Sequence, residues 1–155
     1  MAVIIHDAAR LPGRRTTVYP AAFAAGLKGR IKRALGDAGG LTQFGVNLTT
    51  LEPGATSALR HWHSREDEFV YVLGGELTLV TDEGEEPLGP GMAVAFPAGE
   101  ANAHQIANRS KAAATYLEIG TRAADDVITY PDDDLQLVKR DGQRVFVRKS
   151  GEPYE

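Results

Sequence analysis

Residues 54–75 read GATSALRHWHSREDEFVYVLGG, and two histidines, His61 and His63, stand one residue apart near the middle of this stretch. On an extended strand, side chains two residues apart point to the same face, about 6.5–7 Å from each other along the chain. Two imidazoles on one face can bind a single metal ion. A His-x-His pair on an exposed strand also occurs by chance, so the pair alone leaves both metal binding and a plain surface position open.

Glu68 adds a carboxylate to the two histidines. The four residues 64–67 separate it from His63, which is enough for a turn that brings the chain back beside the histidines. Glu68 is followed at a period of two by Val70 and Val72. We therefore expect it on an otherwise apolar strand face, where a lone buried carboxylate is costly and a bound cation removes that cost.

His104 is the third candidate histidine. It follows a Pro-Ala-Gly turn at residues 97–99 and precedes Asn108. Three imidazoles and one carboxylate would hold one divalent ion and leave coordination positions open, as catalytic sites do. The predicted ligand set is His61, His63, Glu68 and His104. The remaining histidine, His6, is interpreted as a surface residue.

The segments around these residues alternate apolar and polar side chains with a period of two. Short strands recur about every 8–12 residues between Gly- and Pro-rich turns. The predicted strands cover residues 44–48, 59–63, 69–73, 76–81, 92–96, 104–107 and 113–119. This spacing is typical of a β-sandwich or a small β-barrel. Beyond residue 120, the sequence predicts a solvated acidic turn at residues 132–134 and a hairpin of residues 135–138 and 145–147 around Asp141-Gly142.

One helix is expected, over residues 20–36. Pro20 suits the first helical position, and Leu27, Ile31 and Leu35 recur at i, i+4 and i+8. The basic residues of this segment are interpreted as a solvated face of the helix. They are Lys28, Arg30, Lys32 and Arg33.

The composition limits the class of protein. A length of 155 residues suits a single domain, 1–155, with an N-terminal extension over 1–41 and a C-terminal extension over 121–155. The net charge of −4 argues against nucleic acid as the main partner, because phosphate binding needs a basic surface. With no cysteine, disulfides and thiol nucleophiles are excluded and a cytoplasmic location is expected. No apolar run approaches the about 20 residues of a membrane span, so no membrane partner and no secretory signal are expected.

Both histidine-bearing stretches resemble the conserved motifs of the cupin superfamily. The first motif has Gly, His-x-His, Glu and Gly in that order, and residues 54–75 carry all of them. The second resembles residues 91–108, GMAVAFPAGEANAHQIAN, so the two motifs together span 54–108. The flanking segments 42–51 and 116–122 are similar to a group of small bacterial single-domain cupins. Some members of that group carry the label of sugar-phosphate isomerase.

The resemblance implies an all-β fold, the cupin double-stranded β-helix or jelly-roll barrel, with one divalent metal ion (Zn, Mn, Fe, Ni or Co) inside its mouth. Four residues separate Gly99 from His104, where the family motif has two, and Asn102 stands where the histidine would fall. An insertion of two residues keeps the side-chain parity of an extended segment. His104 is therefore the predicted ligand, and the alternative is a bulged loop with a three-coordinate site.

Two functions are compatible with such a site. The first is a metalloenzyme of the isomerase or dioxygenase type that acts on a small, oxygen-rich anionic or carbonyl substrate. The alternative is a non-catalytic cupin that binds or senses a small molecule. The fold alone does not decide between them.

An isomerase also needs a base, and a sugar phosphate would need a cation in the mouth of the barrel. The nearby acids and tyrosines are all interpreted as lying away from the site: Glu66 and Asp67 as solvated loop charges, and Tyr71, Tyr116 and Glu118 as outward-facing. Arg60 has the wrong parity relative to His61, which leaves Arg65 and Arg109 as the candidate cations.

A homodimer is expected, because barrel sheets have edges and outer faces that must be covered. The apolar residues that could cover a neighbouring copy precede residue 42. They are Val18, Tyr19, Phe23, Leu27 and Ile31.

Overall fold

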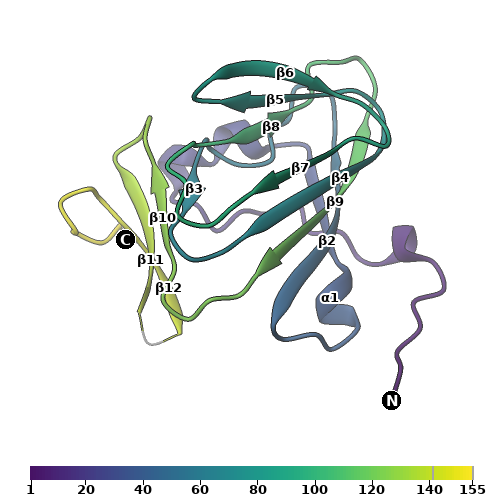
Figure 1. The fold of residues 1–155 in the computed structure, drawn as a ribbon, viewed down its shortest axis with the longest axis horizontal. Helices are drawn as coiled ribbons and strands as arrows, with labels where there is room; N and C mark the ends of the chain where they lie inside the picture. Colours follow the sequence, from purple (N-terminus) through teal and green to yellow (C-terminus); the bar gives the residue numbers. More distant parts are fainter. Residues whose placement is uncertain (141, 155) are drawn as a thin grey trace.

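Antiparallel strands make up most of the regular secondary structure in the computed structural model, which describes residues 1–140 and 142–154 (Figure 1). The largest sheet has the spatial order β1 (Arg30–Ala34), β2 (Phe44–Leu51), β9 (Ala114–Thr121), β4 (Glu68–Gly74) and β7 (Ala93–Phe96). A second sheet has the order β6 (Gly84–Leu88), β5 (Leu77–Thr81) and β8 (Gln105–Ala107). The third has the order β12 (Gln143–Val147), β11 (Leu135–Arg140), β10 (Val127–Tyr130) and β3 (Trp62–His63). The predicted all-β barrel is confirmed.

The main hydrophobic core lies between the five-stranded and the three-stranded sheets. Val70 and Val72 of β4 are buried in one cluster with Leu77 and Leu79 of β5 and with Ile106 of β8. Burying one such side chain contributes about 1.5–3 kcal/mol. The cluster therefore fixes which face of β4 looks inward, and Glu68 shares that face by parity.

Gly75 lies in the short connection between Gly74, the last residue of β4, and β5. Gly75 has a φ of 84°, in the region that favours glycine. A Cβ at this position would lie 2.6 Å from the Cβ of Ala114 in β9. The backbone conformation and this close approach both require glycine here.

The helix predicted over residues 20–36 is wrong for most of its length. Only Leu35–Ala38 (α1) is α-helical, and the residues that carried most of the periodic pattern form 3-10 turns and strand β1. The 3-10 turns of the chain are η1 (Ala8–Arg10), η2 (Ala21–Phe23) and η3 (Ala25–Leu27). Gly29, with a φ of 87°, lies between η3 and β1. Every residue of β1 then pairs with a residue of β2. Pairing at the sheet edge outweighs a helical pattern that its own glycines already weakened.

The segment before β1 packs on the C-terminal sheet of its own chain. Tyr19 lies edge-on to Tyr130 with ring centroids 5.6 Å apart, and Phe23 meets Tyr154 at 5.7 Å. Leu27 is buried as well. Tyr19, Phe23 and Leu27 are therefore covered at least in part by their own chain, and the homodimer stays a prediction.

The predicted C-terminal hairpin is confirmed, since β11 pairs antiparallel with β12. Asp141, in its predicted turn, lies outside the described residues. In the acidic turn, Asp132 and Asp134 are exposed, and Asp132 pairs with Arg60 at 2.8 Å. Within residues 1–140 and 142–154, no helix is long and apolar enough to cross a membrane. The cytoplasmic location stays a prediction.

Candidate metal centre

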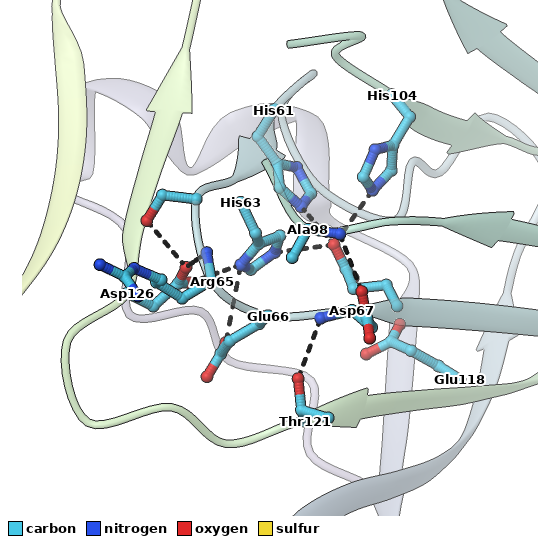
Figure 2. Close-up of polar contacts among 12 residues, drawn as sticks. His61, His63, Arg65, Glu66, Asp67, Ala98, His104, Glu118, Thr121 and Asp126 are labelled. Carbon is cyan, nitrogen blue, oxygen red and sulfur yellow. Dashed lines mark hydrogen bonds and ion pairs between the residues drawn. The ribbon is translucent and has the colours of Figure 1, made fainter. Parts of the chain in front are cut away.

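Three imidazoles converge on one carboxylate oxygen inside the barrel. The Oε1 atom of Glu68 lies 2.7 Å from Nε2 of His63, 3.1 Å from Nε2 of His104 and 3.4 Å from Nε2 of His61. Figure 2 shows the three rings turned toward a common centre. The structure thus brings together all four residues that the sequence selected, and their binding of a metal stays a prediction.

Backbone pairing sets the positions of these four side chains. His61 and His104 form an antiparallel bridge, and His63 pairs with Ile128 of β10. Glu68 begins β4 and lies opposite Gly120 of β9, which has no side chain to fill the space beside it. Pairing between His61 and His104, and of His63 and Glu68 with other strands, therefore holds the four donors in place.

The longer gap before His104 does not move it from the centre. His104 keeps the parity expected for an insertion of two residues, and its Nε2 atom lies within hydrogen-bond distance of Glu68. Asn102, which stands where the family histidine would fall, instead accepts a hydrogen bond from the backbone N–H of Asp82 at 3.0 Å. The alternative of a bulged loop that leaves out His104 is not what the structure shows.

Two of the imidazoles are oriented through their Nδ1 atoms. Nδ1 of His61 lies 2.7 Å from the carbonyl oxygen of Leu59, and Nδ1 of His63 lies 2.6 Å from Oδ2 of Asp126. Donation from Nδ1–H to these acceptors leaves each Nε2 lone pair free for a metal ion. His104 is held differently, because its ring stacks on Phe96 with centroids 3.6 Å apart and an interplanar angle of 8°.

The charges around the centre favour a cation. Burial alone would raise the pKa of Glu68, but hydrogen bonds with His104, His61 and His63 hold that pKa well below its usual value. Burial alone would lower the pKa of His63, but hydrogen bonds to Asp126 and Glu68 outweigh it and raise the pKa to about 10. His104 differs, since burial lowers its pKa. In the metal-free protein, the positive charge of protonated His63 thus partly balances the negative charges of Glu68 and Asp126. A set of three imidazole nitrogens and one carboxylate oxygen fits a divalent ion in place of that proton.

Glu66 and Asp126 both lie beside Nδ1 of His63, on the side of the ring away from Glu68. The sequence did not indicate this position for either residue. Glu66 was predicted to be a solvated loop charge, and this is wrong: it is 6% exposed, and its Oε2 accepts a hydrogen bond from Nζ of Lys139 at 2.6 Å. Its Oε1 lies 3.6 Å from Nδ1 of His63. Asp126 is fully buried, and no local motif around it indicated that it would contact His63. Asp67 is exposed, as predicted.

A cavity of about 440 Å³ opens onto the centre. Its polar wall includes Tyr116 and Glu118, so the prediction that these two residues face outward is wrong. In the register of β9 they lie opposite Val72 and Val70, which are buried on the inner face of β4. The cavity also reaches the cations of β1, Arg30 and Lys32.

Glu118 is an acidic residue of this wall, and it lies on β9 two residues before Gly120, which pairs with Glu68. Its Oε1 accepts hydrogen bonds from Nζ of Lys32 at 3.1 Å and from Nδ2 of Asn47 at 3.3 Å. The ammonium of Lys32 balances its charge.

Two residues that were expected to lie away from the centre, Tyr71 and Arg60, do so. Tyr71 is 41% exposed on the outer face of β4, as its parity predicted. Arg60 bonds to Asp132 on the surface, again as parity predicted. The candidate cations Arg65 and Arg109 do not line the cavity, and Arg109 instead pairs with Glu85.

Comparison with known proteins identifies the family. A cupin domain matches residues 47–120. Among solved structures, a sugar phosphate isomerase of the cupin superfamily from Silicibacter pomeroyi is 48% identical, with a TM-score of 0.91 over 96% of this chain and 95% of that chain. A protein from Acidithiobacillus ferrooxidans, provisionally named as a sugar phosphate isomerase, is 34% identical, with a TM-score of 0.82 over 92% and 88%. The polyketide cyclase RemF from Streptomyces resistomycificus is 26% identical, with a TM-score of 0.63 over 78% and 80%.

The chain belongs to the cupin superfamily. No curated protein matches it. The cupin barrel carries different activities in its neighbours, so the activity of this chain has to be argued from its own side chains.

Proposed function

We propose that this cupin is a metal-dependent enzyme that acts on a small, oxygen-rich anionic or carbonyl substrate, with a sugar phosphate as the favoured class. The observation that carries the proposal is Glu118, a carboxylate in the wall of the same cavity as the candidate metal centre. A cavity built only to bind a ligand needs no such group, whereas acid–base chemistry does.

The metal would be held by His61, His63, Glu68 and His104. Three neutral imidazoles and one carboxylate leave a divalent ion with a net charge of +1, which favours oxygen ligands of negative charge. When bound, the ion would polarise a substrate oxygen as a Lewis acid. Its identity, among Zn, Mn, Fe, Ni and Co, follows from metal analysis of protein purified without a histidine tag.

Glu118 would act as the acid–base residue. Lys32 and Asn47 hold one of its oxygens by hydrogen bonds, which fixes the carboxylate against the wall. A carboxylate held in this way can take a proton from a substrate carbon and return it to the neighbouring atom, as an isomerisation requires. An isomerisation needs such a positioned proton carrier, so the presence of Glu118 favours the isomerase type. The names of two similar structures, from Silicibacter and Acidithiobacillus, point the same way.

The test is exchange of substrate hydrogen with solvent. Metal-loaded protein is incubated in heavy water with a panel of aldose and ketose phosphates, and deuterium incorporation is followed by NMR. Glu118→Gln should retain the metal and lose at least about 100-fold in exchange rate. Glu76→Gln, an exposed acid, should keep both. Full metal content without exchange or turnover of any sugar phosphate or oxygen substrate would instead favour the non-catalytic binding module.

We also propose that the protein is a homodimer, as expected from the sequence, but that its interface lies on a different surface. Phe69, Tyr71 and Leu73 stand on the outer face of β4 and are 40%, 41% and 46% exposed. A row of large apolar side chains on a flat sheet face favours contact with a second copy. The outer face of the five-stranded sheet therefore replaces the N-terminal segment as the proposed interface.

A further inference from the structure

We propose that Arg30 binds the oxyanion group of the substrate, a phosphate monoester or a carboxylate, in the cavity that leads to the candidate metal centre. The inference rests on the proposed function and adds to it the residue that selects an anionic substrate. Arg30 was predicted to be a solvated residue of a helix; as the first residue of β1 it instead lines the barrel cavity.

Arg30 is a buried cation that forms no salt bridge within the described part of the chain. It is 7% exposed, and its Nη1 donates a hydrogen bond of 2.6 Å to the carbonyl oxygen of Ser57. No carboxylate in residues 1–140 and 142–154 lies within salt-bridge distance of it. By contrast, two other cations lining the same cavity, Lys32 and Arg122, pair with Glu118 and Asp37.

A buried guanidinium without an anion is energetically costly, and a protein retains one where a ligand supplies the missing charge. The guanidinium is planar and presents a fork of N–H donors that matches the two oxygens of a carboxylate or phosphate. Because one Nη1 bond to Ser57 fixes the group, the remaining donors are pre-oriented for such an oxyanion.

The wall of the same cavity also carries Tyr116 of β9. Tyr116 is buried and lies directly opposite Thr49 of β2. Burial raises the pKa of Tyr116 well above its usual value and outweighs the side-chain hydrogen bond with Thr49, which lowers it. The phenol therefore stays protonated and adds no negative charge to the cavity that Arg30 lines.

The distance between Arg30 and the centre suits a small ligand. Ser57, which Arg30 contacts, precedes His61 by four residues, so their Cα atoms lie at most about 14 Å apart. Arg30 and the four candidate ligands also line one cavity. A small molecule with an anionic end and an oxygen-rich end can therefore contact both.

The test compares three probes by titration calorimetry: ribose 5-phosphate, ribonate and ribose, each with metal-loaded and with chelator-treated protein. The first two supply a phosphate and a carboxylate, and the third supplies neither. Arg30→Met should weaken binding of the preferred anionic probe by about 10- to 100-fold and leave metal content unchanged. Arg144→Met, an exposed cation of the same cavity, should change it by less than about threefold.

Stability measurements separate an anion site from a structural arginine. Without ligand, Arg30→Met should melt at or above the wild-type temperature, because the substitution removes an uncompensated buried charge. Arg30→Lys keeps the charge without the fork and should bind the probe with intermediate affinity.

The inference is overturned if Arg30→Met binds the probes as tightly as the wild type, if Arg144→Met loses as much, or if the metal-loaded wild type binds none of them. Anion binding that depends on Arg30 in a protein that takes up no metal would support the anion site and refute the proposed metalloenzyme.

Discussion

His61 and His104 lie directly opposite each other, and each donates its backbone N–H to the carbonyl of the other, at 3.0 and 2.8 Å. Their imidazole centroids are 4.6 Å apart. The two residues come from the two separate sequence motifs, so the motifs meet through the backbone itself. Because these bonds involve no side-chain atom, replacing a histidine ring removes a donor without removing the pairing that positions the others.

His63→Ala is expected to release most of the metal at neutral pH and to destabilise the protein. The substitution removes one of four donors and also the group that compensates Glu68 in the metal-free state. If ligand binding at about 100 times Kd contributes about 2.7 kcal/mol, its loss lowers the melting temperature by about 5–10 °C. Elemental analysis and calorimetry measure the two effects.

The matched control for this variant is His6→Ala, because His6 is an exposed histidine far from the centre. It should leave metal content and melting temperature at wild-type values. Should His63→Ala do the same, the assignment of the metal centre is wrong. Loss of metal without loss of stability would indicate adventitious binding at the surface.

Asp126→Asn is expected to weaken metal binding without removing any ligand. The carboxylate accepts the Nδ1–H of His63 at 2.6 Å and the backbone N–H of Arg65 at 2.8 Å, so it holds the ring with Nε2 toward the centre. Loss of such an outer partner typically costs about 10- to 100-fold in metal affinity. Competition with a chelating dye measures the change.

Asp125→Asn is the control for the same chemical change one residue away, on an exposed side chain. It should bind metal as the wild type does. Equal affinities in Asp126→Asn and the wild type would show that the negative charge of the Asp126 carboxylate does not contribute to metal binding.

Backbone parity explains why the four converging residues could be found from the sequence. His61 and His63 share a strand face, and Glu68 follows one turn later, and both of these steps are local. His104 was selected through the resemblance to the second cupin motif, relative to which an insertion of two residues keeps its side-chain parity. Asp126 contacts His63 from 63 residues further along the chain, and no local pattern encodes that contact.

The inner wall of the cavity could not be predicted for a different reason. Alternation in β9 shows that Tyr116 and Glu118 share a face, but the opposite face carries Leu117 and Ile119, so apolar character does not tell which face looks inward. Arg30 was hidden because a helical pattern outweighed the strand pattern in its segment. Pairing with β2, which the sequence does not reveal, decides both positions.

The homodimer prediction is tested at the outer face of β4. Tyr71→Glu places a charge in the middle of the proposed interface and should shift the protein from dimer to monomer in light scattering at micromolar concentration. Val18→Glu probes the N-terminal segment, where Val18 is 64% exposed, and should leave the dimer intact. A wild-type protein that scatters only as a 16.6 kDa species would contradict the dimer. If Val18→Glu dissociates the dimer and Tyr71→Glu does not, the interface lies on the N-terminal segment instead.

The last prediction concerns pH and the charge of His63. Burial would lower the pKa of His63, but hydrogen bonds to Asp126 and Glu68 raise it from 6.5 to about 10 in the folded, metal-free protein. A folded-state pKa above the unfolded value means that protonated His63 stabilises the fold fully below about pH 6.5 and progressively less as the pH rises toward 10. Asp126 stays ionised across this range, because burial, which raises its pKa, is outweighed by hydrogen bonds that lower it to about 2.

Chelator-treated protein should therefore lose stability relative to His63→Ala as the pH rises from about 6.5 to 10. Taking the difference between the two proteins cancels the lysines and tyrosines that titrate in both. Metal-loaded protein should show the opposite trend, because protons compete with the ion for Nε2 and affinity rises with pH. Melting curves at each pH, with and without metal, measure both trends. A difference that does not change with pH would mean that His63 is neutral in the metal-free protein and that the carboxylates are balanced in another way.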